Sequence, residues 1–266
     1  MKIELIRYTN DPDGLAGEAA AICYNAKNPD LARDHAMDGG HESISEHASF
    51  TFRVEGVSRA LLAQLTRHRL ASFSVQSQRY VNYLKGFDYV TPPKIVALGE
   101  DAVAEYDRQM ATIHEWYVGW KEKLGKGEGG NEDARFVLPN ACATRLIVTM
   151  NVRELRHFFS LRCCTRAQWE IRAMANEMLK LCKEVAPKLF ANAGAGCVRG
   201  YCPEGAKSCG RIKPKEMVEV IHAEWIDVWF DGEIKSFCTN CERTNKQYKP
   251  PFCPHCGAKM GVKRDV

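Results

Sequence analysis

The sequence has no long apolar run, and this absence limits where the chain can reside. No stretch approaches the roughly 18 apolar residues that a membrane-spanning helix needs. The N-terminal stretch MKIELIRYTNDPDG becomes polar after six residues, so it also lacks the apolar segment of a signal peptide. We therefore expect a cytoplasmic protein.

Two further features are weak or missing. The net charge is only +4 over 266 residues, which is too small to indicate a general nucleic-acid-binding protein. The glycine-rich segment 125–130 does not have the spacing of a phosphate-binding loop, and we expect a plain surface loop there. The chain is 45% hydrophobic and 26% charged, as in ordinary globular proteins.

Residue periodicity predicts an α+β fold, in which helices pack on a sheet. Apolar and polar residues alternate over 1–9 and 48–55, which indicates two half-buried strands. Apolar residues at helical spacing predict helices over 14–24, 57–69 and 101–124.

Two more helices are predicted from capping signals. Asn151 and Glu154 fit an N-cap with a reciprocal Glu, and Thr165 and Gln168 fit a capping box. The chain must break between these two helices. This break places Arg162 at the junction.

The chain has 12 cysteines, and four of them form two C-x-x-C pairs near the C-terminus. Cys238 and Cys241 form the first pair, Cys253 and Cys256 form the second, and eleven residues separate the two pairs. Four thiolates on two such turns make the closed tetrahedral site of a structural zinc ion. We predict a β-rich zinc-ribbon module over 216–266, after a main domain over 1–215.

A second group of cysteines lies in the Gly- and Pro-rich segment 194–214. Cys197, Cys202 and Cys209 could hold a metal ion if another part of the chain supplied a fourth ligand. The alternative is that they are free thiols in an ordered loop, and this is the interpretation that the sequence favours.

The densest polar segment, 64–80, is rich in Arg, Ser and Gln and contains neither Lys nor Glu. A merely solvated surface uses Lys and Glu, whereas the planar guanidinium of Arg binds phosphate oxygens in pairs. On a helix that reached residue 69, Arg67 and Arg69 would point about 200° apart. They would then contact different anions, as in a site for two phosphorylated ligands. His68, taken alone, is interpreted as a core histidine with satisfied hydrogen bonds.

A second basic cluster spans residues 135–172. Arg153 and His157 are four residues apart and share one helical face. Surface ion pairs are the alternative interpretation for Arg156, Arg166 and Arg172. The cluster consists of Arg135, Arg145, Arg153, Arg156, His157, Arg162, Arg166 and Arg172.

Together these clusters resemble one family. Arg67-His68-Arg69, followed after seven residues by Ser77, is the signature of flavin-dependent thymidylate synthases, and the chain is similar to them over about 1–210. The same family is indicated, in order and at family spacing, by the segments 41–47, 135–139, 151–153, 161–162 and 167–170.

The resemblance implies the fold of that family and the reductive methylation of dUMP to dTMP. Methylenetetrahydrofolate would donate the carbon, FAD would be the prosthetic group and NADPH the reductant. Family members are homotetramers with active sites shared between subunits. FAD would be held by Ser43, Arg67, His68, Arg69, Asn151, Arg153 and His157. dUMP would be held by Gln64, Arg67, Gln76, Ser77, Gln78, Arg79, Arg135 and Arg162.

By the same resemblance, Arg162 would be the catalytic residue. Its guanidinium would stabilise negative charge on the pyrimidine as N3 loses its proton. Ser77 is assigned to binding, because the sequence identifies no base that could activate it as a nucleophile. The chain departs from the family at Val75, where many members carry a Glu or Gln that can touch both ligands.

Two alternatives stay open. A zinc-ribbon protein that binds nucleic acid would also use arginines, but the segment 64–80 lies roughly 160 residues before the ribbon. A cysteine-dependent thymidylate synthase would need a thiolate nucleophile, and Cys164 lies close to Arg162 and Arg166 in the sequence. Nothing else in the chain resembles that second family, and Cys163 and Cys164 are also interpreted as small core residues.

Overall fold

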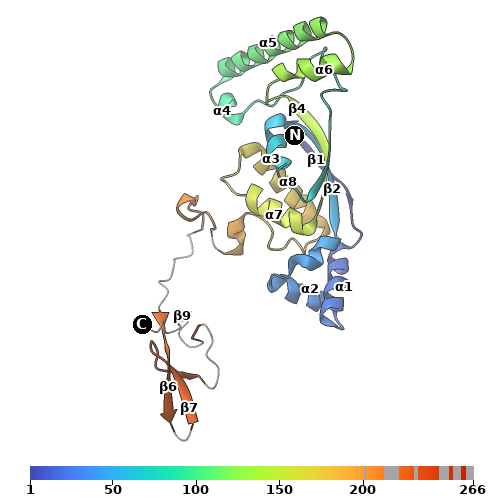
Figure 1. Ribbon diagram of the computed structural model, residues 1–266. Coiled ribbons are helices and arrows are strands. Elements are labelled where there is room, and N and C mark those ends of the chain that lie inside the picture. Colours follow the sequence, from blue (N-terminus) through green and yellow to red (C-terminus); the bar gives the residue numbers. More distant parts are fainter. Residues whose placement is uncertain (201, 213–221, 231–232, 246–251, 254–258, 262–266) are drawn as a thin grey trace. The chain divides into compact units, whose positions relative to one another are not determined.

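The computed structural model describes residues 1–200, 202–212, 222–230, 233–245, 252–253 and 259–261. The chain divides into two compact units, Met1–Pro214 and Lys215–Val266, and most of their helices and strands are labelled in Figure 1. Among the helices that the structure describes, none is both long and apolar enough to cross a membrane.

The first unit is built on an antiparallel sheet with the strand order β1-β2-β4-β3. The sheet and its helices confirm the predicted α+β class, and β1 and β2 confirm the two strands predicted from alternation. Strand β4 was not among the predicted strands. The strands are β1 (Lys2–Tyr8), β2 (Ser49–Ser58), β3 (Ala71–Val75) and β4 (Ala143–Asn151).

Eight α-helices and four short 3₁₀ helices are described in this unit. The α-helices are α1 (Pro12–Tyr24), α2 (Pro29–Asp38), α3 (Arg59–Leu65), α4 (Pro93–Val96), α5 (Glu100–Leu124), α6 (Glu128–Ala134), α7 (Val152–Arg162) and α8 (Trp169–Val185). The 3₁₀ helices are η1 (Glu42–His47), η2 (Arg135–Val137), η3 (Gly196–Arg199) and η4 (Gly205–Lys207).

One face of the sheet forms the main hydrophobic core. Phe52 of β2 pairs in register with Val148 of β4, and both side chains are fully buried. Helices α7 and α8 lie against this face, where they contribute Phe158 and Met174 to the same core (Figure 1). Because burying one large apolar side chain contributes about 1.5–3 kcal/mol, this packing fixes α7 firmly on the sheet.

A β-bulge in β2 directs the chain into α3. The register against β4 shifts between Glu55 and Val57, and Gly56 between them has φ of 68°, a conformation that favours glycine. β2 ends at Ser58, whose hydroxyl caps α3. Buried Glu170 of α8 accepts hydrogen bonds from the backbone N–H and the hydroxyl of Ser58, at 2.7 and 2.5 Å. The start of α3 is therefore held by α8.

Helix α3 is shorter than predicted, which corrects the expected geometry of the signature. It ends at Leu65, with Thr66 as its C-cap. Arg67 and Arg69 therefore lie in the turn between α3 and β3, and the helical angle between them does not apply. Pairing of β3 with β4 requires an extended chain from Ala71 onward, and this tertiary contact overrides the helical pattern.

The glycine-rich segment is not the plain surface loop that we expected. Helix α6 begins at Glu128, directly after its N-cap Gly127. The buried ammonium group of Lys121 in α5 donates hydrogen bonds to the carbonyls of Gly125 and Gly127, at 3.0 and 3.2 Å. These bonds give the buried ammonium group its partners and tie α5 to the start of α6.

The capping box predicted at Thr165 is not formed. Gln168 caps α8 instead, and its side-chain oxygen accepts hydrogen bonds from the backbone N–H groups of Glu170 and Ile171, at 3.0 and 3.1 Å. Helix α7 ends at Arg162. This confirms the predicted position of Arg162 at the junction of the two helices.

The second unit is a small β-rich module. Its core contains Ala223, Cys238 and Cys253, with Trp225 and Cys241 packed against them. Strands β6, β7 and β8 form an antiparallel sheet, and β5 pairs with β9 in parallel. The strands are β5 (His222–Ala223), β6 (Trp225–Phe230), β7 (Glu233–Cys238), β8 (Thr244–Asn245) and β9 (Lys259–Met260).

Candidate functional site

His68 connects the two basic clusters inside the first unit. Its side chain is buried, and its ring lies 5.0 Å from the ring of Phe158 in an edge-on arrangement. Its Nδ1 lies 2.9 Å from an oxygen of buried Glu154. The Nε of Arg162 donates a hydrogen bond to the Nε2 of His68 at 3.2 Å. The imidazole therefore has a partner on each nitrogen.

The partners of His68 determine its tautomer. A guanidinium can only donate, so Nε2 of His68 must accept from Arg162, and the ring proton must lie on Nδ1 and point to Glu154. Burial lowers the pKa of His68, and the charge of Arg162 lowers it further, whereas the hydrogen bond that His68 donates to Glu154 raises it. The ring is therefore neutral near pH 7. Burial also lowers the pKa of Arg162, and the nearby charge of Arg67 adds to this.

Helix α7 supplies most of this arrangement through its spacing. Glu154, Phe158 and Arg162 are four residues apart along α7, so they lie on one face and all three contact His68. Asn151 caps the helix as predicted, because its side chain accepts from the backbone N–H of Glu154 at 2.9 Å. Glu154 does not return this bond; its carboxylate is used for His68.

Glu154 is thus a residue that the sequence analysis missed as part of the site. The usable signal was an acidic residue on the same helical face as Phe158 and Arg162, next to the apolar stripe of α7. A carboxylate on a buried face needs a partner with a proton to donate. His68 provides that partner from a segment 86 residues away.

An open hollow of about 690 Å³ lies beside α7, and we call it the α7 hollow. It brings together three of the predicted FAD residues, Asn151, Arg153 and His157. Arg153 forms an ion pair with Glu46 of η1. The volume falls within the range of small-molecule sites. The hollow is lined by Glu42, Glu46, Leu70, Asn151, Arg153, Glu154, His157, Ser160 and Arg199.

Arg156 differs from the surface ion pair that was one interpretation. Its guanidinium is buried, donates to the backbone oxygen of Leu189 at 2.6 Å and pairs with Glu42 at 3.1 Å. It therefore ties α7 to η1 through Glu42, which also lines the hollow. Arg166 forms an exposed ion pair with Glu204, as that interpretation predicted.

The predicted dUMP residues lie partly at the end of β3 and partly against α6. Gln76 and Ser77 line a hollow of about 510 Å³ at the end of β3. Arg79 pairs with Glu128 at 2.5 Å and with Glu132 at 3.2 Å, both on α6. Arg135 donates from Nε to the backbone oxygen of Glu132 at 3.0 Å. Both Arg79 and Arg135 therefore contact helix α6.

Other predicted residues have different surroundings. Gln64 is half-buried, and its backbone oxygen lies 3.5 Å from a guanidinium nitrogen of Arg162. The amide of Gln78 is directed at the Sγ of Cys142, at 3.7 Å. Arg67 and Arg69 are exposed. Ser43 lines a separate hollow of about 360 Å³ between α1 and η1. The predicted ligand residues of one chain therefore form separate groups.

Cys163, which is the neighbour of the candidate nucleophile Cys164, is unsuited to nucleophilic attack. Burial raises the pKa of Cys163 to about 12, so its thiol stays protonated near pH 7. Ser77 also lacks an activating base among the residues that the structure describes, since its hydroxyl accepts a bond from the backbone N–H of Arg79 at 3.1 Å.

The second unit brings three of the four predicted zinc ligands together. The sulfurs of Cys238, Cys241 and Cys253 lie within 4.8 Å of one another, and those of Cys241 and Cys253 are 3.7 Å apart. Tetrahedral zinc with Zn–S bonds of about 2.3 Å requires sulfurs about 3.8 Å apart, so this arrangement fits the ion. The fourth predicted ligand, Cys256, lies outside the described residues.

The fold and the α7 site belong to a known class of enzyme. Residues 4–188, which include most of the sheet, helix α7 and the His68 contacts, match the family described as thymidylate synthase complementing protein. This match covers well over half of the chain.

Named relatives make the family more specific. A flavin-dependent thymidylate synthase of Clostridium tetani is 46% identical over 235 residues, which cover 79% of this chain and 94% of the relative. The flavin-dependent thymidylate synthase of Geobacter sulfurreducens is 48% identical over 224 residues, with the same coverage of both chains. That of Pyrococcus abyssi is 39% identical over 223 residues, covering 77% and 90%. The chain therefore belongs to the flavin-dependent thymidylate synthase family, and it is an enzyme of dTMP synthesis.

Proposed function

We propose that this enzyme converts dUMP to dTMP, with methylenetetrahydrofolate as the carbon donor, FAD as the prosthetic group and NADPH as the reductant. The observation that carries the proposal is the position of Arg162. In a member of this family, it is held by a neutral His68, whose own orientation is fixed by Glu154.

FAD would bind at the α7 hollow and the exposed turn beside it. The donors suited to a diphosphate are Arg153 and His157 of α7 and Arg67 and Arg69 of the turn. Bound FAD would supply the redox chemistry, and the chain would supply orientation and charge. The Asn151 side chain is occupied as a helix cap, so its contribution would be to place Arg153 and His157.

Arg162 would act on the pyrimidine of dUMP. Uracil C5 is a poor nucleophile, and it becomes a better one when N3 loses its proton and the ring gains negative charge. A guanidinium fixed in a half-buried position can stabilise that charge without reorganising during the reaction. Because Nε of Arg162 donates to His68 and one terminal nitrogen lies 3.5 Å from the backbone oxygen of Gln64, the other terminal nitrogen is left as a donor for the ligand.

The dUMP phosphate would be held by Arg79, Arg135 and Ser77. Arg79 is paired with Glu128 and Glu132, so phosphate binding would require it to exchange carboxylate partners for phosphate oxygens. Gln64, Gln76 and Gln78 would supply neutral donors or acceptors around the same ligand.

We further propose that the active site is completed by a neighbouring copy in a homotetramer. The support is that the predicted ligand residues of one chain form separate groups, at the α7 hollow, at the β3 end and at the hollow of Ser43. A second copy could bring the Arg79 group of one chain to the α7 hollow of another.

The C-terminal unit would bind one structural zinc ion through Cys238, Cys241, Cys253 and Cys256. A module this small has too little core to be stable without metal. Replacing Cys238 and Cys241 by Ser should remove this zinc and unfold the second unit while the first keeps its flavin. Loss of flavin in the double variant would instead mean that the ribbon helps to build the active site.

Purification followed by an activity assay tests the proposed reaction. The protein should be yellow, with flavin absorbance near about 450 nm, and it should release tritium from dUMP labelled at C5 when folate and reduced nicotinamide are both present. Omission of either should stop the release.

Two results would contradict the proposal. Tritium release that continues in flavin-free protein would remove FAD from the reaction. Colourless, inactive protein that shifts labelled DNA in a gel would favour the nucleic-acid-binding alternative.

A further inference from the structure

The segment that contains η3 and η4 and continues to Ile212 is called the tail. A small cavity lined by cysteines lies between the α7–α8 junction and this tail. Its volume is about 20 Å³, which is room for one water molecule or one ion. Cys164 comes from the junction, and Cys197, Cys202 and Cys209 come from the tail around η3 and η4. None of these residues takes part in the proposed reaction.

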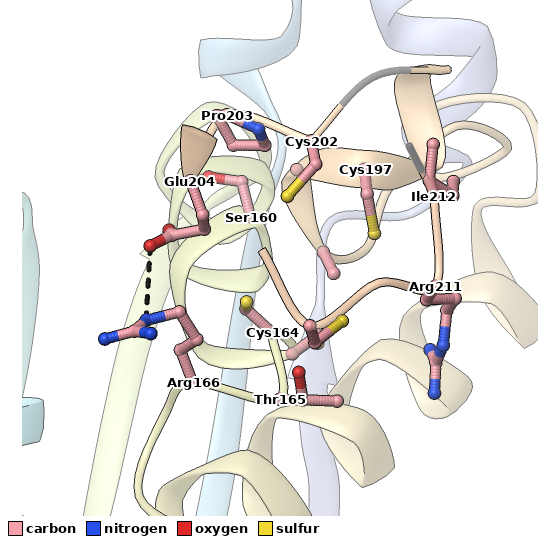
Figure 2. A pocket seen from close by; sticks show the side chains of 14 residues that line it. Ser160, Cys164, Thr165, Arg166, Cys197, Cys202, Pro203, Glu204, Arg211 and Ile212 are labelled. Carbon is pink, nitrogen blue, oxygen red and sulfur yellow. Dashed lines mark ion pairs between the residues drawn. The ribbon is translucent and has the colours of Figure 1, made fainter. Parts of the chain in front are cut away.

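Three of these cysteines direct their sulfurs toward a common space, and Cys209 lines the same cavity. In Figure 2 the thiols of Cys197 and Cys202 enter the cavity from the tail, and that of Cys164 enters from the opposite side. The tail is anchored here by Arg166, which pairs with Glu204 at 3.4 Å and donates to the backbone oxygen of Lys207 at 3.1 Å. These contacts hold the two segments face to face.

Neighbouring cysteines in this region differ in their chemistry. The Thr165 hydroxyl and the backbone N–H of Arg211 donate hydrogen bonds to the sulfur of Cys209. Such bonds stabilise a thiolate, which is the form that binds metal ions. Cys163 also lines the cavity, but it is half-buried whereas Cys209 is exposed. The junction thus places two cysteines at the cavity wall, and Figure 2 shows the thiol of Cys164 on the side opposite the tail thiols.

We propose that Cys164, Cys197, Cys202 and Cys209 bind a second zinc ion, in a site separate from the ribbon. Four sulfur ligands at a closed site select zinc over harder cations. The cavity has room for a single ion and not for an iron–sulfur cluster. Four thiolates around Zn²⁺ carry a net charge of about −2, and Arg166 and Arg211 on the cavity wall offset it.

Binding would draw the tail inward. Within the described part of the chain, only the ribbon sulfurs already lie within 4.8 Å of one another, so the tail thiols must approach to reach the separation of about 3.8 Å set by tetrahedral zinc. The tail contains Gly200, Gly205 and Gly210, all with positive φ, and the chain can turn at these positions. Metal binding releases thiol protons and needs no oxidant or reductant.

Zinc content of the full-length protein tests the site independently of the ribbon. Protein with the substitutions Cys238→Ser and Cys241→Ser should retain one zinc ion per chain, measured by inductively coupled plasma mass spectrometry. Adding Cys197→Ser and Cys209→Ser to it should reduce the content to none. Adding Cys163→Ala instead is the matched control and should leave one ion.

A ribbon variant without zinc would overturn the proposal, whether or not the wild-type protein binds zinc in its ribbon. A zinc-free ribbon variant whose intact mass shows a tail disulfide would overturn it as well, and would identify a redox pair.

A second measurement uses the unmodified protein and does not depend on any variant folding. During brief alkylation, exposed Cys23 should react at once, whereas Cys197, Cys202 and Cys209 should react only after a strong chelator is added. Alkylation of the three tail thiols at the rate of Cys23, with no chelator present, would contradict the site.

Discussion

Arg67 belongs to the first basic cluster and Arg162 to the second, and their guanidinium groups differ in burial and in hydrogen-bond partners. Arg162 is half-buried, and its Nε is fixed on His68. Arg67 is exposed, and no residue in the described part of the chain forms a hydrogen bond or ion pair with its guanidinium. One group is set in place by the fold before any ligand arrives, and the other must gain its partners from a ligand or a neighbouring subunit.

This difference separates catalysis from binding. A group that stabilises a transition state is most effective when it is already oriented, and Arg162 is positioned by a buried hydrogen-bonded chain. A group that grips a phosphate can remain solvated until binding, because its charge is compensated by water. The comparison predicts different consequences when members of each set are replaced.

Replacing Arg162 should have the largest effect. In Arg162→Ala, thymidylate formation should fall by about 10³-fold, in line with the loss of one preorganised donor, while FAD content stays near the wild-type value. The assay is tritium release together with flavin absorbance. Arg108→Ala, at an exposed ion pair on α5, is the control and should have wild-type activity. Near-normal turnover in Arg162→Ala would refute the catalytic role.

Glu154→Gln should have the next largest effect. The amide can also donate to Nδ1 of His68, so the tautomer is no longer fixed and Arg162 loses its orientation. A misplaced catalytic group costs up to about 100-fold, and we expect kcat to fall by about 10- to 100-fold with a smaller change in KM for dUMP. Glu105→Gln, on the surface of α5, is the matched control. Equal kcat in Glu154→Gln and wild type would show that the Glu154–His68 pair is only structural.

Arg67→Ala should weaken ligand binding rather than the fold. Losing one hydrogen bond to a charged group costs about 1.5–3 kcal/mol, so FAD affinity should fall by at least about 10-fold. The free energy of unfolding of the ligand-free protein should change by less than about 0.5 kcal/mol, because the side chain is exposed. Titration with FAD and thermal unfolding measure the two quantities. A large loss of stability with unchanged affinity would reverse the contrast between Arg67 and Arg162.

The smallest expected effect is a pH dependence of stability. His68 has a lowered pKa in the folded state, so below about pH 6.5 the unfolded chain binds its proton more readily. Stability should therefore fall as the pH decreases through this window, by at most about 1.4 kcal/mol per pH unit from this one group. Unfolding of wild type and His68→Asn from pH 5 to 8 should show a shallower slope in the variant. Identical slopes would mean that His68 is not held neutral by the fold.

Local patterns were sufficient for some elements of the fold and not for others. Alternation in β1 and periodicity in α5 come from the residues themselves, and both predictions were confirmed. Strand β3 was hidden in a polar segment, because its identity depends on pairing with β4. Helix α6 was not predicted, because glycines are frequent around its start. Lys121 of α5 donates hydrogen bonds to the carbonyls of Gly125 and Gly127 just before α6, and no local pattern indicates this contact.

The candidate site shows the same limit. The residues of the signature could be named from the sequence, because their spacing is local. The pairing of His68 with Glu154 and Arg162 joins segments 86 and 94 residues apart, and no local pattern specifies such contacts. Likewise, Cys164 as a neighbour of the three tail cysteines follows from packing of the tail on the α7–α8 junction.

A crystal structure of the enzyme with FAD and dUMP bound tests the central claim most directly. The account predicts a single cavity, completed by a neighbouring subunit, in which Arg67 and Arg69 reach the ligand phosphates and Arg162 contacts the pyrimidine beside the flavin. Arg69 and Arg162 on unrelated surfaces, with no ligand-filled space shared by them within or between subunits, would contradict it.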